Sequence, residues 1–200
     1  MQAVTTTAEL EALYGAAVPG ALTKVFPQLT PCYREWIERS RFVIVSTVGP
    51  QGTDSSPRGD IDCVVRITNP QTLWLPDWRG NNRMDSLRNI VQDGRISLLF
   101  MVPGCNNVVR VNGQAIVTTD SVATASFNAN NKHPRSVIIV TVGEVYFQCA
   151  KALMRSKLWL AEDESDRVPS AGDFLREVDA GFDGQAYDDN YPEYAKDKMW

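Results

Sequence analysis

The chain has 200 residues, of which 44% are hydrophobic, and its 20 basic and 24 acidic side chains give a net charge of −4. This composition predicts one globular domain with a substantial core and, at most, an appended terminal element. The balanced charge argues against general nucleic-acid binding, which usually requires a strongly basic surface. No apolar run approaches the roughly 20 residues that span a bilayer, and residues 1–15 lack a signal-peptide pattern. We therefore expect a cytoplasmic protein that binds neither nucleic acid nor a membrane.

The cysteines are widely scattered and give no metal-binding pattern. Cys32, Cys63, Cys105 and Cys149 include no closely spaced pair, and His133 is the only histidine in the sequence. A Cys–His nucleophile would have to use His133, which no local pattern supports. We expect no metal site, and we expect each cysteine to be a small buried apolar residue rather than part of a disulfide framework.

The N-terminal part of the chain is predicted to be helical. Thr6 and Glu9 form a capping-box pattern at the start of one helix, and Thr30 followed by Pro31 starts a second. We expect residues 1–40 to form a helical segment that packs on the domain after it.

Short strands dominate the next part, which we predict to be one domain over residues 41–160. Three segments are rich in β-branched or aromatic residues and are separated by Gly, Pro and Asn turns: Arg41–Val48, Ile61–Ile67 and Thr72–Leu75. A fourth, residues 95–102, is apolar on both faces, as expected of a strand that is covered on both sides.

Two longer strands follow in the sequence. Residues alternate between apolar and polar from Val109 to Val117, and Gly113 within this run indicates a bulge or a close backbone approach. A short helix near residues 121–129 precedes a long strand over Ser136–Phe147. Strands with mostly brief connections favour an antiparallel barrel over a parallel sheet with crossover helices.

Polar residues gather where one of the predicted helices begins. Asn82 is placed to cap this helix, whose apolar residues Met84, Leu87 and Ile90 recur every three positions, and Gly94 ends it.

The start of this helix is a candidate anion site. The first turn of a helix presents unpaired N–H groups and partial positive charge, so Asn81, Asn82 and Arg83 are placed to bind a phosphate. Arg58, in the segment SSPRGD, offers a forked second contact because a guanidinium matches two phosphate oxygens. Alternatively, Asn82 is only a cap and the arginines are solvated.

A second basic group lies on a predicted helix over Cys149–Trp159. Lys151, Arg155 and Trp159 follow one another at i, i+4 spacing on one face. An anion between the two cations would turn their repulsion into attraction, and Trp159 could cover an aromatic ring or stack on Arg155. The alternative is a solvated basic face with a half-buried tryptophan.

The C-terminal tail, residues 161–200, differs in composition from the rest. It begins with the acidic segment AEDESDRVPS, which is typical of a linker, and continues with DFLREV, which predicts one short helix. Its remaining aromatic residues need a surface to bury against, so we expect the tail to wrap over the body of the protein. These residues are Phe182, Tyr187, Tyr191, Tyr194 and Trp200.

Several segments together resemble a known family. Five segments in one consistent order carry the resemblance: SSPRGD, LWLPDWRGNNRMDSLRNI, DGRISLLFMVPG, RVNGQA and YFQCAKALMRSKLW. The region from roughly Arg41 to Trp159 is similar to the pyridoxamine 5′-phosphate oxidase-like FMN-binding proteins, in particular an uncharacterised branch of FMN-dependent enzymes. The resemblance implies an α+β, mainly β fold, a split β-barrel of antiparallel strands with flanking helices. It also implies a homodimer with FMN at the subunit interface, so that the tail would cover the body or the dimer partner.

The same resemblance assigns cofactor-binding residues. In that family, an arginine on the strand leading into the barrel and a polar, basic turn before the following helix hold the FMN phosphate and ribityl chain, and a nearby strand end runs beside the flavin. The basic pair on the last helix either reaches the same phosphate or places positive charge near the flavin ring. The matching residues are Ser56, Pro57, Arg58, Leu75, Pro76, Asn81, Asn82, Arg83, Lys151 and Arg155.

Two departures from the family limit the choice of substrate. Pyridoxamine phosphate oxidases proper share a C-terminal Arg-x-His element that grips the substrate phosphate, and this sequence has none. Where this branch usually has His-Cys, the chain has Gln148-Cys149, so a role that needs an imidazole there is absent, while a hydrogen-bonding or packing role remains available to Gln148. The first departure argues against pyridoxamine phosphate as the substrate.

The sequence therefore predicts an FMN-dependent oxidoreductase that acts on a small molecule, with a nicotinamide nucleotide among the candidate substrates. No catalytic acid or base is assigned, because flavin hydride transfer does not require one. The alternatives are a related split-barrel protein that uses a deazaflavin or haem, a flavin-binding module without turnover, and an interaction protein with a vestigial anion site.

Overall fold

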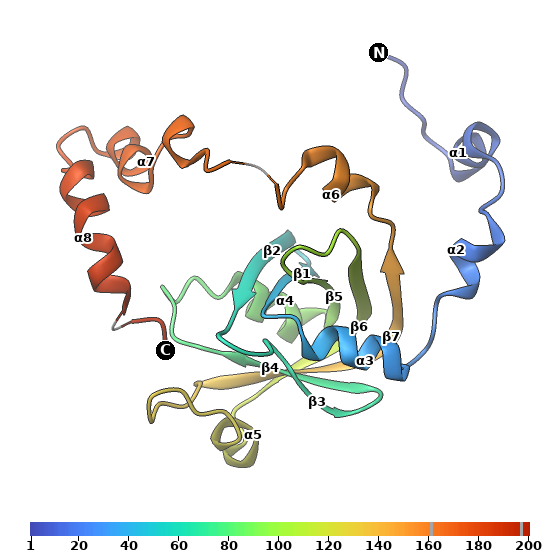
Figure 1. Cartoon of the computed structure of the whole chain (residues 1–200), viewed down its shortest axis with the longest axis horizontal. Helices are drawn as coiled ribbons and strands as arrows, with labels where there is room; N and C mark the ends of the chain where they lie inside the picture. Colours follow the sequence, from blue (N-terminus) through green and yellow to red (C-terminus); the bar gives the residue numbers. More distant parts are fainter. Residues whose placement is uncertain (161, 197) are drawn as a thin grey trace.

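A curved antiparallel sheet of seven strands organises the chain in the computed structural model, which describes residues 1–160, 162–196 and 198–200 (Figure 1). Its strand order is β2-β1-β5-β6-β7-β4-β3. The mainly β, α+β fold predicted from the sequence is confirmed. The strands are β1 (Phe42–Gly49), β2 (Gly52–Gly59), β3 (Arg66–Asn69), β4 (Thr72–Asp77), β5 (Arg95–Met101), β6 (Val108–Thr118) and β7 (Ser136–Gln148).

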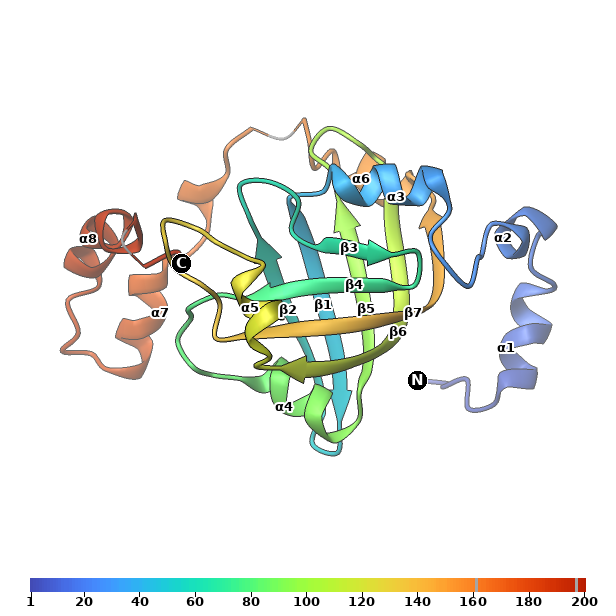
Figure 2. The same ribbon diagram turned by 90° about the horizontal axis from the view of Figure 1, so that it is seen from below.

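Helices surround this barrel. Helices α3 and α4 lie at its opposite ends, while α1 and α2 stand on one side of it and α7 and α8 on the other (Figure 2). No helix in the described part of the chain is long and apolar enough to cross a membrane. The helices are α1 (Thr7–Tyr14), α2 (Pro19–Thr23), α3 (Pro31–Glu38), α4 (Asp85–Gln92), α5 (Ser121–Ala125), α6 (Lys151–Ser156), the 3₁₀ helix η1 (Ser165–Arg167), α7 (Ala171–Val178) and α8 (Gly184–Lys196).

The buried strand residues of the barrel core come from one face of β1, β4, β5, β6 and β7. In β5, for example, Ile96, Leu98 and Phe100 are buried, as the period of two in a strand requires. Helix α3 closes one end of this core with Tyr33 and Ile37.

The N-terminal segment is only partly packed on the barrel. The Tyr33 hydroxyl donates to the Lys24 carbonyl (2.9 Å) and accepts from the Phe147 N–H (3.2 Å), which ties α3 to β7. The capping box of Thr6 and Glu9 is confirmed at the start of α1, but that helix buries none of its residues. Within residues 1–40, the contact with the barrel therefore comes from α3 and from the segment just before it, where Leu29 is buried in the core and Phe26 bridges to Val145.

The bulge predicted at Gly113 is present and bends the sheet. The register between β6 and β7 shifts between Asn112 and Gly113. A Cβ atom at Gly113 would lie 2.0 Å from the Thr141 carbonyl oxygen, so only glycine allows the two strands to approach this closely. Beyond the bulge, Ala115 to Thr118 of β6 pair only with β7, while the preceding residues also pair with β5.

The prediction of a strand over Ile61–Ile67 is wrong in its position along the chain. The chain instead forms β2 over Gly52–Gly59, turns with Val64 and Val65 buried, and resumes as β3. The sequence of β2 is rich in Gly, Ser and Asp, which are depleted in strands. It also contains Pro57, which is tolerated because β2 is an edge strand.

Two predicted helices are shorter than expected. Helix α5 ends at Ala125 rather than near residue 129. Helix α6 ends at Ser156, because Lys157 adopts the left-handed conformation (φ 51°) that terminates a helix. Trp159 therefore does not lie on the helical face of Lys151 and Arg155.

The C-terminal tail contains a helical hairpin, whose first helix, α7, covers the short helix predicted at DFLREV. Helices α7 and α8 pack against each other, with Gly172 and Gly184 in backbone contact and the Gly172 N–H donating to Asp188 Oδ1 (2.9 Å). Ala161, the first residue of the predicted linker, lies outside the described residues. That the tail wraps over the body or over a dimer partner stays a prediction.

We expect Gly113→Ala to lower the free energy of unfolding by about 1–3 kcal/mol, because the methyl group would overlap with main-chain atoms that cannot move away. The measurement is chemical denaturation followed by circular dichroism. Gly20→Ala is the control, since a Cβ there meets no atom within 4 Å and alanine is the better helix former. Equal losses in the two variants would show that the bulge does not require glycine.

Candidate functional site

A concave surface lies between β2, β4 and the loop that leads into α4. Its volume is about 600 Å³, within the usual range of small-molecule sites. Four arginines and three aspartates line it, which gives the site a net positive charge. These residues are Arg58, Arg79, Arg83, Arg135, Asp54, Asp77 and Asp85.

Two bridges between β2 and β4 form one wall of this site. Arg58 Nη1 lies 2.7 Å from Asp77 Oδ1, and both side chains are largely buried. The indole N–H of Trp78 donates to Asp60 Oδ2 (3.1 Å). These contacts fix the orientation of the Arg58 guanidinium.

Arg58 keeps hydrogen-bonding capacity for a ligand. Its Nε atom is buried, yet it has no acceptor among the described residues. A buried N–H without an acceptor is costly, and a bound anion would supply the missing oxygen. Asp77 leaves this donor unmatched, so the geometry of Arg58 fits an oxyanion ligand.

The opposite side of the site is formed by the loop before α4. The Asn81 side chain accepts from the Arg83 N–H (3.0 Å), and Arg135 Nη1 donates to Asn82 Oδ1 (3.3 Å). Arg135 comes close to this loop because its neighbour Ser136 pairs with Asp77 in the β4–β7 ladder.

Asn82 does not cap α4 as predicted. It adopts a left-handed conformation (φ 63°) in the loop, and α4 begins at Asp85 with Met84 in the cap position. Asparagine tolerates this conformation better than most residues, which explains its presence at the turn. No side chain caps α4, so the N–H groups of its first turn are open to a ligand.

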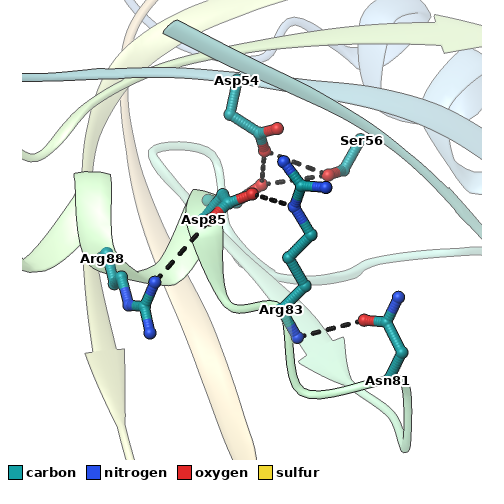
Figure 3. A network of polar contacts seen from close by, with 7 residues as sticks. Asp54, Ser56, Asn81, Arg83, Asp85 and Arg88 are labelled. Carbon is teal, nitrogen blue, oxygen red and sulfur yellow. Dashed lines mark hydrogen bonds and ion pairs between the residues drawn. The ribbon is translucent and has the colours of Figure 1, made fainter. Parts of the chain in front are cut away.

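A polar network joins β2 to the first turn of α4 (Figure 3). Asp54 Oδ2 accepts hydrogen bonds from the hydroxyls of Ser56 (3.0 Å) and of the buried Ser86. Arg83 extends toward Asp54 and Asp85 and is 2.6 Å from the latter, which raises the pKa of the Arg83 guanidinium (Figure 3).

The structure brings most of the predicted cofactor residues together. Ser56, Pro57 and Arg58 line the same concave surface as Asn81, Asn82 and Arg83, although the two groups are far apart in sequence. Leu75 and Pro76 belong to the adjoining strand β4, but both are buried in the barrel wall and do not line the site.

Lys151 and Arg155 are not part of this concave surface. Both are exposed on α6, which borders a different groove with α2 and the ends of β5 and β7. Trp159 turns away from them, and its indole N–H donates to the Cys105 carbonyl (2.8 Å).

The cysteines are free thiols; Cys63 and Cys105 are half-buried. Burial raises the pKa of the Cys63 thiol, which donates to the carbonyls of Val65 (2.9 Å) and Ile37 (3.3 Å). Cys32 and Cys149 are exposed, so the expectation that each cysteine is buried is wrong for these two. Within the described ranges, no group of three His, Cys, Asp or Glu side chains is arranged to hold a metal ion.

Comparison with known proteins identifies the family. Residues 29–149, more than half of the chain, match the family model described as pyridoxamine 5′-phosphate oxidase. The chain belongs to the pyridoxamine 5′-phosphate oxidase-like split-barrel family. A comparison with curated proteins found no match.

Solved structures of low sequence identity are similar to this chain. A histidine-to-alanine variant of HupZ from Group A Streptococcus is 18% identical with a TM-score of 0.50, and the match covers 60% of this chain and 98% of that one. A candidate pyridoxamine 5′-phosphate oxidase from Lactobacillus delbrueckii is 20% identical (TM-score 0.49, covering 60% and 95%). An FMN-binding protein from Syntrophomonas wolfei is 12% identical (TM-score 0.42, covering 58% and 88%).

Several residues of the site were missed by sequence reasoning, among them Arg79 of the loop before α4 and Asp85 of its first turn. Asp54, Asp77 and Ser86 act through contacts between β2, β4 and α4, and Arg135 precedes a strand in a segment with no motif. The pairing of β4 with β7 would have placed Arg135 next to Asp77, but that pairing joins residues about 60 positions apart.

We expect Ser86→Ala to lower the free energy of unfolding by about 1–3 kcal/mol, because it removes a buried donor to Asp54. Urea denaturation measures this change. Ser55→Ala is the matched control, since the hydroxyl of Ser55 bonds only to Ser46 on the exposed surface. A loss no larger than in the control would mean that this contact does not hold α4 on β2.

Proposed function

We propose that this protein is a cytoplasmic, homodimeric FMN-dependent oxidoreductase that binds the FMN phosphate in the concave surface between β2, β4 and α4. The observation that carries this proposal is the buried Nε of Arg58, which lacks an acceptor in a site lined by four arginines. The family of the chain, whose proteins typically bind FMN, supports the choice of this cofactor.

The residues present fit the phosphate end of a mononucleotide. Arg58 would bind one phosphate oxygen through Nε while Asp77 holds Nη1, so the guanidinium is oriented before the ligand arrives. The uncapped first turn of α4 offers N–H donors, and Arg83 and Arg135 add positive charge. Asn81 and Asn82 shape the loop that would surround the phosphate and ribityl oxygens.

Bound FMN would supply the hydride and electron transfer, while the protein binds the cofactor, orients it and sets the local field. Leu75 and Pro76 lie in the wall of the barrel next to Asp77, so β4 would contact the cofactor through its main chain at the strand end. No side chain in the site is placed as a clear proton donor, consistent with a reaction that needs none from the protein.

Lys151 and Arg155 are assigned to the cofactor of the other subunit. Both are exposed and neither lines the concave surface of its own chain. In a homodimer with FMN at the interface, α6 of one subunit would supply positive charge near the flavin of the other, where it stabilises the reduced anion.

The substrate is proposed to be a small molecule other than pyridoxamine phosphate, with a nicotinamide nucleotide as a candidate electron donor. The only histidine, His133, lies 2.5 Å from the Phe127 carbonyl through Nδ1 and does not line the site. The alternatives of a deazaflavin, haem or a non-catalytic flavin module differ in their absorbance or in their reduction by NADH and NADPH.

We expect the purified protein, after incubation with FMN and removal of the excess, to show the double absorbance band of oxidised flavin. Arg58→Ala should weaken FMN retention by at least about tenfold, since a charged hydrogen-bond donor is lost, and Arg58→Lys should restore it only in part. Arg39→Ala, on the far exposed surface of α3, is the control. Retention of FMN by Arg58→Ala at the parental level would rule out this site.

Mixing two defective variants tests whether α6 acts across subunits. We expect Arg58→Ala and the double variant Lys151→Ala/Arg155→Ala each to bind FMN weakly. After subunit exchange, the mixed dimer would contain one site with both defects and one intact site, so about a quarter of all sites should regain tight binding at equal mixing. Fluorescence of retained FMN measures this recovery; no recovery would place both groups in the same subunit's site.

A further inference from the structure

The outward face of the barrel wall carries two ordered cross-strand rows. The strand registers align Ile44 of β1, Leu99 of β5, Arg110 of β6 and Tyr146 of β7 in one row. All four side chains are half-buried. This row therefore runs across the middle of four adjacent strands, with an arginine in an otherwise apolar and aromatic setting.

The neighbouring row is polar and ends in an acid. It consists of Ser46, Ser97, Asn112 and Glu144, in the same strand order. The Asn112 amide donates to Glu144 Oε1 (2.7 Å), which holds the carboxylate on this face. Arg110 and Glu144 thus lie diagonally next to each other on one surface.

The apolar residues of this face lack a cover in the single chain. The sequence of β5 is apolar on both sides, yet only its inward residues are fully buried, while Leu99 and Met101 remain half-buried. Both line a groove of about 680 Å³ that is bordered by α2 and α6. Two further apolar side chains that line it, Val18 of the α2 cap and Phe147 of β7, are exposed. Such a continuous apolar surface is typical of a protein–protein contact.

The two charges on this face are also incompletely matched. Arg110 Nη1 donates to the Tyr146 hydroxyl (3.2 Å), but the Nε atom of Arg110 is buried without an acceptor. Across the part of the chain that the structure describes, neither Arg110 nor Glu144 forms an ion pair. A partly desolvated guanidinium and carboxylate of this kind are stabilised when an opposite charge approaches.

We propose that this face, defined by the two rows and the adjoining groove, binds a second copy of the chain, with Arg110 of each copy paired to Glu144 of the other. A two-fold axis requires a self-complementary surface, in which residue i meets j and j meets i. Arg110 and Glu144 lie side by side and satisfy that requirement, because the two-fold rotation places Arg110 of one copy opposite Glu144 of the other, and the reverse. Ser46 and Ser97, in the same row as Glu144 on β1 and β5, have small side chains that leave room for close approach of the two sheets.

This inference rests on the homodimer of the proposed function and specifies its interface. It assigns a role to Arg110 and Glu144, neither of which lines the candidate cofactor site. An unrelated partner would need a matching pair of charges of its own, whereas a second copy supplies that pair by symmetry.

Charge reversal tests the pairing. We expect the full-length protein to be a dimer by light scattering coupled to size exclusion. Arg110→Glu and Glu144→Arg should each weaken dimerisation by about 30-fold or more, because each places like charges in contact, and the double variant R110E/E144R should restore the dimer. Arg39→Glu, at an exposed position on α3, is the control and should stay dimeric.

Dimeric single variants, a monomeric parent, or monomeric singles that the double variant does not rescue would overturn the proposal. If a reversal prevents folding, as judged by circular dichroism, Arg110→Met and Glu144→Gln serve instead, and unchanged dimerisation in both would likewise overturn it. FMN absorbance is recorded on the same samples: a dimer across this face without FMN contradicts the proposed cofactor, whereas a monomer that binds FMN contradicts this interface.

Discussion

The curvature of β6 at Gly113 is the constraint on which the rest of the structure depends. Strands β2 and β4 are separated in the sheet by four others, yet Arg58 and Asp77 at their ends are 2.7 Å apart. A flat sheet would hold these residues well over 15 Å apart at about 4.8 Å per strand. At the bulge, Gly113 has no side chain, so the main chains of β6 and β7 come close together. The bulge also bends β6, and the sheet curves so that the ends of β2 and β4 meet. The barrel closure and the candidate site thus have one cause.

Closure of the barrel also brings Asp77 next to Arg58, and this ion pair shapes the electrostatic potential of the site. Asp77 neutralises one edge of the Arg58 guanidinium and holds it in place, so a ligand that binds the remaining edge loses less conformational entropy than it would with a free arginine. The carboxylate also repels an anion. The other three arginines of the site, Arg79, Arg83 and Arg135, offset the negative charge of its aspartates. On the other side, the contact of Asp54 with Ser86 keeps the uncapped start of α4 facing the same space.

Sequence reasoning succeeded where a local pattern decides the structure. Local patterns identified three strands: a run that is apolar on both faces for β5, alternation for β6, and a long strand-like segment for β7. A single glycine located the bulge, and each of these signals lies within one segment. Sequence reasoning failed at β2, whose Gly, Ser, Asp and Pro residues are tolerated only at the edge of a sheet, and edge position is a property of the whole topology. It failed at the end of α6 because a lysine rather than a glycine adopts the left-handed conformation there. Family resemblance grouped Arg58 with Asn82, but Asp77 and Arg135 join the site only through the pairing of β4 with β7.

The inward and outward faces of the barrel wall differ in how far a single chain covers them. The apolar side chains of the inward face are buried within the chain. The outward face of β5 and β6 is not covered in this way, because it leaves half-buried apolar residues and two unpaired charges beside α6. If a second copy covers that face, α6 of each subunit is carried toward the other. A cofactor held by both subunits then stabilises the dimer by mass action, and dimerisation in turn raises the affinity for the cofactor. Cofactor binding and assembly would therefore titrate together, with protein concentration setting the apparent affinity for FMN.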